Sequence, residues 1–215
     1  MRLQHIDGKH LYHFFLYGRR KVQENFENLN RINVFPVPDG DTGTNLSLTM
    51  HAIVEQPPAS DSASEVSMHL ADAALSGSHG NSGIIFAQFV QGLSDSIQGK
   101  HRIDPKEFVC AVRSGVESAY RALSRPVEGT ILTVMKAWAG SLHTLHDKGV
   151  DFLDNLYQSL ETARTALSET PKQLKQLGTP AWWMRAHRDS SIFSRGCCIS
   201  SRVTGPPTRP YLRRS

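Results

Sequence analysis

The stretch that most constrains this chain runs over residues 33–50, where two prolines lead into a pair of aspartates separated by a single glycine. Each proline fixes its own φ and biases the residue before it toward an extended conformation, so Asp39 follows a stiff segment. The glycine permits a sharp turn, which lets the carboxylates of Asp39 and Asp41 converge. Converging carboxylates repel each other unless a cation joins them, and hard oxygen ligands of this kind suit Mg²⁺. This stretch therefore predicts a magnesium site.

A helix is predicted to begin immediately after the aspartates, because an apolar pattern with helical spacing follows. The first amides of a helix have no partner within it, and the positive end of the helix dipole lies at the same place, so this helix start favours a phosphate beside the metal. A plainer alternative is an Asp-Gly-Asp turn that only caps the helix. The residues predicted to contact phosphate here are Thr42, Gly43, Thr44 and Asn45.

A second candidate phosphate loop covers residues 76–83, with three glycines in eight residues directly before an apolar run. Glycine lets the backbone approach an anion closely, and amide and hydroxyl side chains at a helix start supply donors. The alternative is a glycine-rich connection between two helices, with Ser82 as the N-cap. The residues predicted to contact phosphate in this loop are Gly80, Asn81, Ser82 and Gly83.

These two stretches and a third, residues 126–134, together resemble the nucleotide-binding domain of the dihydroxyacetone kinase L-subunit superfamily, and in particular the N-terminal domain of bacterial fatty acid kinases. The three motifs occur in the family's order, and the resemblance covers about residues 7–178. It implies an all-α fold, a barrel or bundle of about seven to eight antiparallel helices with the nucleotide site in the loops at one end. It also implies that the domain binds ATP or ADP with two Mg²⁺ ions.

The resemblance assigns roles to individual residues. It implies that Asp39 and Asp41 hold Mg²⁺, with Asn33 near the position at which dihydroxyacetone kinases carry a further aspartate. The third motif would lie beside the nucleotide through Gly129 and Thr130. No residue is assigned as a general acid or base.

One departure from the family pattern lies in the second motif. Relatives read Gly-Ala-Arg-Gly-Asn-Ser-Gly, whereas this chain has Ser78 and His79 in place of the alanine and the arginine. An arginine carries a permanent charge and binds phosphate with two parallel hydrogen bonds, but a histidine replaces it only when protonated. The departure predicts weaker stabilisation of phosphate charge.

Apolar side chains at helical spacing predict helices for most of the chain up to residue 178. Asp104, Pro105 and Glu107 form a capping box that predicts the start of one of them. The last clear helix is expected to be followed by a short one that begins at Pro171. The predicted inward residues of the last clear helix, 151–169, are Phe152, Leu153, Leu156, Leu160, Ala163 and Leu167. The predicted helix ranges are 7–30, 44–54, 65–76, a helix from about residue 84, 104–123, 131–146 and 151–169.

Charge is distributed unevenly along the chain. The net charge of +4 comes from residues 179–215, which carry seven arginines and one acid, whereas the residues before them are slightly acidic. A basic protein favours nucleic acid or anionic membranes, but here the excess belongs to one terminal segment, so no nucleic-acid partner is expected. Three cysteines without a CxxC pair indicate neither a zinc site nor a disulfide framework. His143 and His146, three apart on one predicted helix, are a weak metal candidate.

Two further features concern the ends of the chain. The N-terminus has no apolar signal region and no apolar run is long enough to span a membrane, which predicts a soluble, cytoplasmic protein. After residue 178 the sequence has no helical or strand period, and its composition predicts disorder.

The genetic code suggests an origin for this tail. Trp and Met each have one codon, so Ala181-Trp182-Trp183-Met184 reads GCN TGG TGG ATG, and a shifted frame through it encodes Val-Asp. Relatives in the family carry Val-Val-Asp-Ala-Gly at this point. We therefore predict a nucleotide-binding domain over residues 1–178, truncated at its C-terminal end, and a frame-shifted tail over 179–215. Sequencing of the coding DNA would test this.

The function implied by the resemblance is ATP- and Mg²⁺-dependent phosphoryl transfer to a fatty acid held by a fatty-acid-binding carrier protein, giving an acyl phosphate. A fatty carboxylate needs no general base because it is already ionised at neutral pH. Loss of the Asp-Ala-Gly segment predicts weak nucleotide binding and little turnover. The alternatives are phosphoryl transfer to dihydroxyacetone (glycerone), a non-catalytic nucleotide-binding module, and a nucleic-acid binder that acts through its tail. The oligomeric state stays open.

Overall fold

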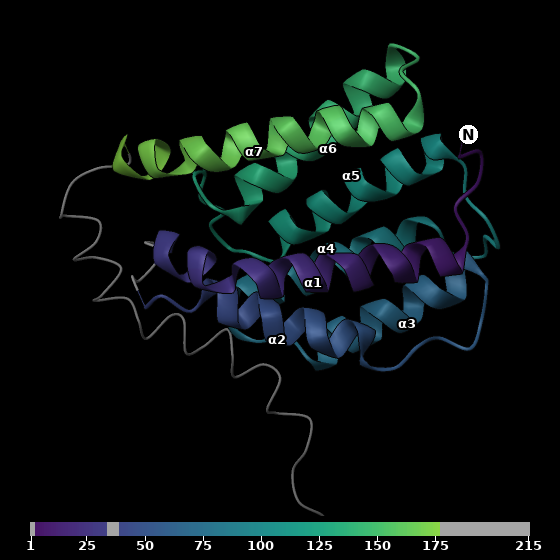
Figure 1. The fold of residues 1–215 in the computed structure, drawn as a ribbon, viewed down its shortest axis with the longest axis horizontal. Helices are drawn as coiled ribbons and strands as arrows, with labels where there is room; N and C mark the ends of the chain where they lie inside the picture. Colours follow the sequence, from purple (N-terminus) through teal and green to yellow (C-terminus); the bar gives the residue numbers. More distant parts are fainter. Residues whose placement is uncertain (1–2, 34–38, 177–215) are drawn as a thin grey trace, which may run out of the picture. The chain divides into compact units, whose positions relative to one another are not determined.

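The computed structural model describes residues 3–33 and 39–176, which belong to one compact unit of the chain. Within the described ranges the chain forms seven α-helices (Figure 1). The predicted all-α fold is confirmed. The helices are α1 (Gly8–Ile32), α2 (Thr42–Glu55), α3 (Ala63–Ser76), α4 (Gly80–Ser96), α5 (Pro105–Arg121), α6 (Ile131–Asp147) and α7 (Phe152–Gln176).

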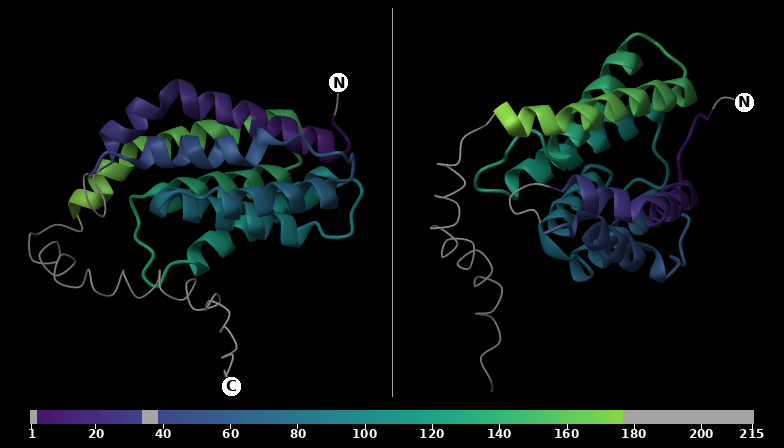
Figure 2. Two further views of the ribbon diagram at one scale, coloured as in Figure 1. Left: turned by 90° about the horizontal axis from the view of Figure 1, so that it is seen from below. Right: turned by 60° about the vertical axis from the view of Figure 1, so that its left-hand side comes forward.

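Successive helices run in opposite directions (Figures 1 and 2), so their connections alternate between the two ends of the bundle. One end is tied together by backbone hydrogen bonds: Ile6 pairs with Ile103 in an isolated antiparallel bridge, and the Gly8 amide donates to the Asp61 carbonyl at 2.9 Å. The other end carries the α1–α2, α3–α4 and α5–α6 connections, which contain the three sequence motifs. The fold thus brings all three motif loops to one end.

The core lies between the inner faces of the helices, where burial of aliphatic side chains supplies the main driving force for folding. Aromatic contacts cross it: the ring centroid of Phe108 in α5 lies 6.0 Å from that of Phe14 in α1 and 5.5 Å from that of Phe152 in α7. These edge-on pairs link the first and last helices through α5. Among the helices described, none combines the length and apolar composition needed to cross a bilayer. Fully buried core residues include Ile53, Leu70, Val90, Val112, Leu132 and Leu142.

Local capping explains where several helices begin. The Asp104 side chain accepts from the Glu107 amide and the Glu107 side chain accepts from the Asp104 amide, both at 2.8 Å, so the predicted capping box is confirmed. Two helices start earlier than predicted, α2 at Thr42 and α4 at Gly80. Gly80 has a φ of 57°, which only glycine adopts freely and which turns the chain into α4. Ser82 therefore lies inside the first turn of α4 and is not its N-cap.

α7 continues through Pro171 to Gln176, so the prediction of a break before a separate short helix was wrong. Proline lacks the amide that would bond the carbonyl of Leu167. The hydroxyl of Thr170 donates to that carbonyl at 2.7 Å and takes the place of the missing bond. The predicted roles of the prolines in 34–38 and of the chain from residue 177 onward fall outside the described residues.

The predicted inward face of α7 was partly wrong. Leu153, Leu160 and Leu167 are 47%, 44% and 38% exposed. Small and short polar side chains let α7 lie close to α6, where Asn155 Nδ2 donates to the Leu142 carbonyl at 2.9 Å. Counting apolar residues therefore placed Phe152 and Ala163 correctly but assigned three exposed leucines to the inward face. Where burial in α7 is described, over residues 152–170, 172 and 173, the buried residues are Phe152, Asn155, Ser159, Ala163 and Thr170.

Gly115→Ala is expected to destabilise the bundle. A Cβ on Gly115 would lie 2.6 Å from the carbonyl oxygen of Phe89 and 2.8 Å from its ring, so α4 and α5 would have to separate. Overpacking of this kind costs about 1–3 kcal/mol. Gly140→Ala in α6 is the matched control, because no described atom lies within 4 Å of the added methyl group. Removing that glycine should stabilise the helix by about 0.5–1 kcal/mol. Similar shifts of both variants in denaturant unfolding would contradict this packing.

Candidate functional site

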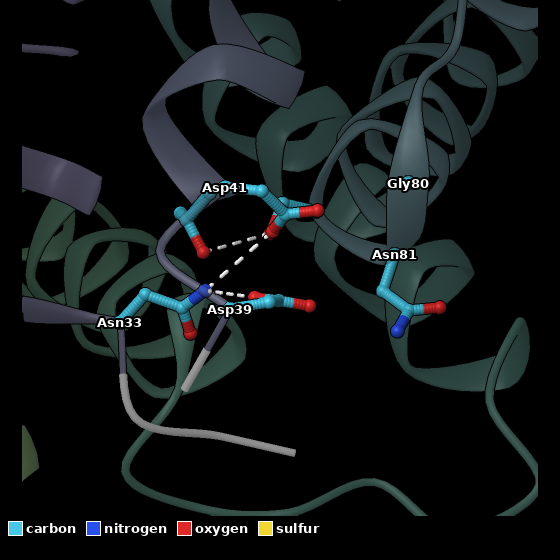
Figure 3. A pocket seen from close by; sticks show the side chains of 7 residues that line it. Asn33, Asp39, Asp41, Gly80 and Asn81 are labelled. Atoms are coloured by element: carbon cyan, nitrogen blue, oxygen red, sulfur yellow. Dashed lines mark hydrogen bonds between the residues drawn. The ribbon is translucent and has the colours of Figure 1, made fainter. Parts of the chain in front are cut away.

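Two of the three motif loops meet in a pocket of about 160 Å³ (Figure 3). The end of α1 and the turn before α2 form one side, and the first turn of α4 forms the other. Figure 3 shows the two aspartates beside Asn33, with Asn81 opposite them. The sequence predicted both sides of this pocket as parts of one site. The lining residues are Asn33, Asp39, Asp41, Thr42, Gly80, Asn81 and Ser82.

The two carboxylates face a common point. Asn33 Nδ2 donates to Asp39 Oδ1 at 2.8 Å and lies 3.5 Å from Asp41 Oδ1. A single N–H donor group therefore relieves the repulsion between the two acids. This is also the position from which a cation would reach both carboxylates, since cation and amide N–H satisfy the same oxygens.

The donor set of the pocket fits a hard cation such as Mg²⁺. Such ions take oxygen ligands, commonly one or two carboxylates completed by water and phosphate. Asn33 presents its amide nitrogen to the acids, so its oxygen becomes a ligand only if the amide turns around. Within residues 3–33 and 39–176 no group of three or more His, Cys, Asp or Glu side chains could hold a metal. His143 instead pairs with Asp147, with Nδ1 2.9 Å from Oδ2.

The first turn of α2 is capped by a residue that the sequence reasoning missed. Asn30 Oδ1 accepts from the amides of Gly43 and Thr44 at 2.7 and 3.1 Å, and Asn30 Nδ2 donates to the Thr44 hydroxyl at 3.0 Å. A Cβ on Gly43 would also collide with the carbonyl oxygen of Phe26 in α1. Gly43 and Thr44 therefore serve helix capping and helix contact here. No local pattern around Asn30 signals this role, because its partners lie 13 and 14 residues away.

The α3–α4 connection is fixed to α2 by Thr49, a second residue that the sequence reasoning missed. Its fully buried hydroxyl donates to the Asn45 carbonyl at 2.8 Å and accepts from the His79 amide at 3.1 Å. Gly83 packs directly against Thr49, because a Cβ there would meet the hydroxyl. Gly83 thus brings α4 against α2, and the Asn45 carbonyl accepts a bond within α2. Thr42 and Ser82 reach the pocket, with their hydroxyl oxygens 3.4 Å apart.

The third motif loop lies at the same end of the bundle, but Gly129 and Thr130 do not line the pocket. The Thr130 hydroxyl donates to the Val127 carbonyl at 2.8 Å and accepts from the Leu132 amide at 3.3 Å, so it caps α6. The Gly129 amide donates to the Thr133 hydroxyl at 2.8 Å. Both groups are bonded within residues 127–133, which are the third loop and the first turn of α6.

Glu128 organises this third loop. Its Oε1 accepts from Tyr120 in α5 at 3.2 Å and from Lys136 in α6 at 3.1 Å, and its Oε2 accepts from Thr133. The hydrogen bond from Thr133 holds the pKa of Glu128 below its usual value against the opposing effect of burial, and Lys136 and Tyr120 contribute in the same direction as Thr133. Burial, followed by the charge of Glu128, raises the pKa of Tyr120 to about 12. One carboxylate thus joins α5 to α6.

Thr49→Val should destabilise the fold by about 1–3 kcal/mol, because the buried His79 amide then has no acceptor while the side chain keeps its shape. Thr49→Ser retains the hydroxyl and should cost less, about the value of one buried methyl group. The free energy of unfolding in urea measures both. A serine variant that is as unstable as the valine variant would contradict the assigned role of the hydroxyl.

Glu128→Gln should lower the pKa of Tyr120 while leaving it above the usual value of about 10, because burial persists when the charge is removed. Ultraviolet titration of tyrosinate measures this, with Glu117→Gln as a control on α5, since Glu117 pairs with Arg113 instead.

The raised pKa of Tyr120 also makes stability depend on pH. Because the pKa of Tyr120 is higher in the folded than in the unfolded protein, it contributes stability that is complete below the unfolded pKa and is lost as pH rises toward about 12. The Tyr120→Phe variant should not show this loss of stability at alkaline pH. An identical decline of the free energy of unfolding in the wild type and in Tyr120→Phe would refute the assignment.

Comparison with known proteins gives the family. Residues 36–188 match the DAK2 domain. Protein YloV of Bacillus subtilis (strain 168) is 38% identical over 180 residues, which is 82% of this chain and 32% of that protein. An uncharacterized protein of Staphylococcus epidermidis is 36% identical over 174 residues, 80% of this chain and 32% of its own length. The chain spans about a third of the length of these curated relatives. Since the family match covers well over half of the sequence, this chain belongs to the DAK2 domain family of kinase-type nucleotide-binding modules.

Proposed function

We propose that this chain is the nucleotide-binding part of an ATP- and Mg²⁺-dependent phosphotransferase. The observation that carries the proposal is the convergence of Asp39 and Asp41 on one point, in the same pocket as the first turn of α4. Carboxylates beside a helix N-terminus suit a metal–phosphate pair, because the acids attract the cation and the helix start attracts the anion. The family match supports the same assignment.

In this proposal each side of the pocket has a separate task. Asp39 and Asp41 hold the cation, with Asn33 completing the set through its amide oxygen, and Asn81, Ser82 and the α4 amides donate to phosphate oxygens. When bound, Mg²⁺ supplies charge neutralisation at the transferred phosphoryl group. The pocket of about 160 Å³ is smaller than the roughly 300–1,000 Å³ typical of sites for whole drug-sized ligands. It suits the phosphate end of a nucleotide, and the base would lie outside it.

The acceptor is proposed to be a fatty carboxylate presented by a fatty-acid-binding carrier protein. Among the residues that line the pocket, the titratable side chains are Asp39 and Asp41, and both are assigned to the cation. An acceptor that is ionised at neutral pH therefore fits better than a hydroxyl acceptor such as dihydroxyacetone, which needs a base.

A second candidate is a module that binds the nucleotide without turning it over. His79 stands where family members carry an arginine, and its Nδ1 lies 2.8 Å from the Gly77 carbonyl oxygen. The ring is thus engaged with its own loop, and His79 does not line the pocket. A permanent cation near the transferred phosphate is missing from this position, which favours binding over catalysis. ATP binding without ATP consumption would identify this case.

Asp39→Ala should weaken binding of ADP in the presence of Mg²⁺ by at least about tenfold, because one of two carboxylates for the cation is lost. Calorimetric titration of ADP with and without Mg²⁺ measures this. Asp95→Ala is the matched control, an exposed aspartate on α4 about 22 Å from Gly80 along the helix. Unchanged Mg²⁺-dependent affinity in Asp39→Ala would refute the proposed function.

A further inference from the structure

Asp41 occupies the N-cap position of α2, yet its side chain makes no capping hydrogen bond. The amides that an N-cap side chain would take, those of Gly43 and Thr44, donate instead to Asn30 Oδ1 at 2.7 and 3.1 Å. Asn30 belongs to the last turn of α1. The cap of α2 is therefore supplied by a different helix.

Two other N-cap aspartates of this chain, Asp7 before α1 and Asp104 before α5, show what Asp41 would otherwise do. Asp7 accepts from the His10 amide at 3.1 Å and Asp104 accepts from the Glu107 amide at 2.8 Å. Both have extended backbones, with ψ of −175° and 171°, as N-cap residues usually do. Asp41 has ψ of −4°, and its carboxylate lines the pocket near Asn33. Asp41 differs from Asp7 and Asp104 in both backbone and side chain.

We propose that Asn30 is a positioning residue for the cation site: by capping α2 from α1 it releases the Asp41 carboxylate to face Asp39. This inference rests on the proposed function for its consequence in binding, although the capping itself does not. Asn30 does not line the pocket and ligates nothing there. It also clamps the two ends of the connection between α1 and α2, since its side chain bonds residues 13 and 14 positions further along the chain.

The same hydrogen bonds distinguish the N-terminus of α2 from the N-terminus of α4 at the pocket. The Gly43 and Thr44 amides are already bonded to Asn30, and the Asn45 amide donates to the Asp41 carbonyl at 2.8 Å. These amides are engaged before any anion arrives. The phosphate is then left to the first turn of α4, where Gly80, Asn81 and Ser82 line the pocket.

Without the Asn30 side chain, Asp41 should turn back to cap α2, since two free amides at a helix start are the usual partners of an N-cap aspartate. The helix would keep its cap and the pocket would lose a carboxylate. Asn30→Ala should therefore reduce the Mg²⁺-dependent gain in ADP affinity by about 10- to 100-fold, the range typical of residues that orient metal ligands. Affinity for ADP without Mg²⁺ should stay the same.

Two variants sharpen the binding test. Asn30→Asp keeps an oxygen for both amides and should retain most of the Mg²⁺-dependent gain. Asn25→Ala is the matched control, an exposed asparagine on α1 whose Nδ2 bonds the Lys21 carbonyl within the same helix. A full Mg²⁺-dependent gain in Asn30→Ala, or an equal loss of affinity with and without Mg²⁺, would overturn the inference.

Amide exchange followed by NMR tests the capping without relying on nucleotide binding. In the ligand-free protein the Gly43 and Thr44 amides should be protected, and adding Mg²⁺ and ADP should not protect them further. They should stay protected in Asn30→Ala, because Asp41 replaces the cap, and lose protection only in the double variant with Asp41→Ala. Fast exchange in the ligand-free wild type, or loss of protection in Asn30→Ala alone, would overturn the inference. If the wild type shows no Mg²⁺-dependent binding of ADP, the proposed function fails, but the amide-exchange experiment still tests whether Asn30 caps α2.

Discussion

The close fit of α2 between α1 and α4 is the constraint on which the rest of the site depends. Gly43 faces the Phe26 carbonyl of α1 and Gly83 of α4 faces Thr49, and neither position leaves room for a Cβ. Helices without intervening side chains approach closely, so the polar groups at their ends come within hydrogen-bonding distance. Gly43 and Gly83 therefore act through packing, and the pocket forms where the packed helices end.

The sequence predicted the fold class and the helices well because their signals are local. The box at Asp104 and Glu107 and the apolar spacing of successive segments each lie within a few residues of the feature they specify. The pairing of the two aspartates with the 80–82 turn was also predicted, since the motifs occur in a family order. Local pattern and tertiary structure agree at these places.

What the sequence could not provide are contacts between distant positions. Asn30 caps an amide 13 residues away and Thr49 accepts from an amide 30 residues away. Neither residue stands out from its neighbours, because a polar side chain on a helix is most often simply solvated. The face of α7 was misjudged for a related reason: Ser159 and Ala163 are buried because α6 lies close by, while Leu160 is exposed. The spacing of apolar residues in a sequence does not show which neighbouring helix packs against which face.

The way α7 is attached has a consequence for how the bundle opens. Its buried side consists mostly of small or polar side chains. One of them is Asn155, whose Oδ1 has no hydrogen-bond partner among the atoms described, so its burial costs free energy. Little apolar surface is returned to water when such a helix leaves, so its departure requires less free energy than removal of α4 or α5. Partial unfolding should begin as a sub-global detachment of α7 from an otherwise intact six-helix body, a transition that leaves Asp39, Asp41 and the α4 turn assembled.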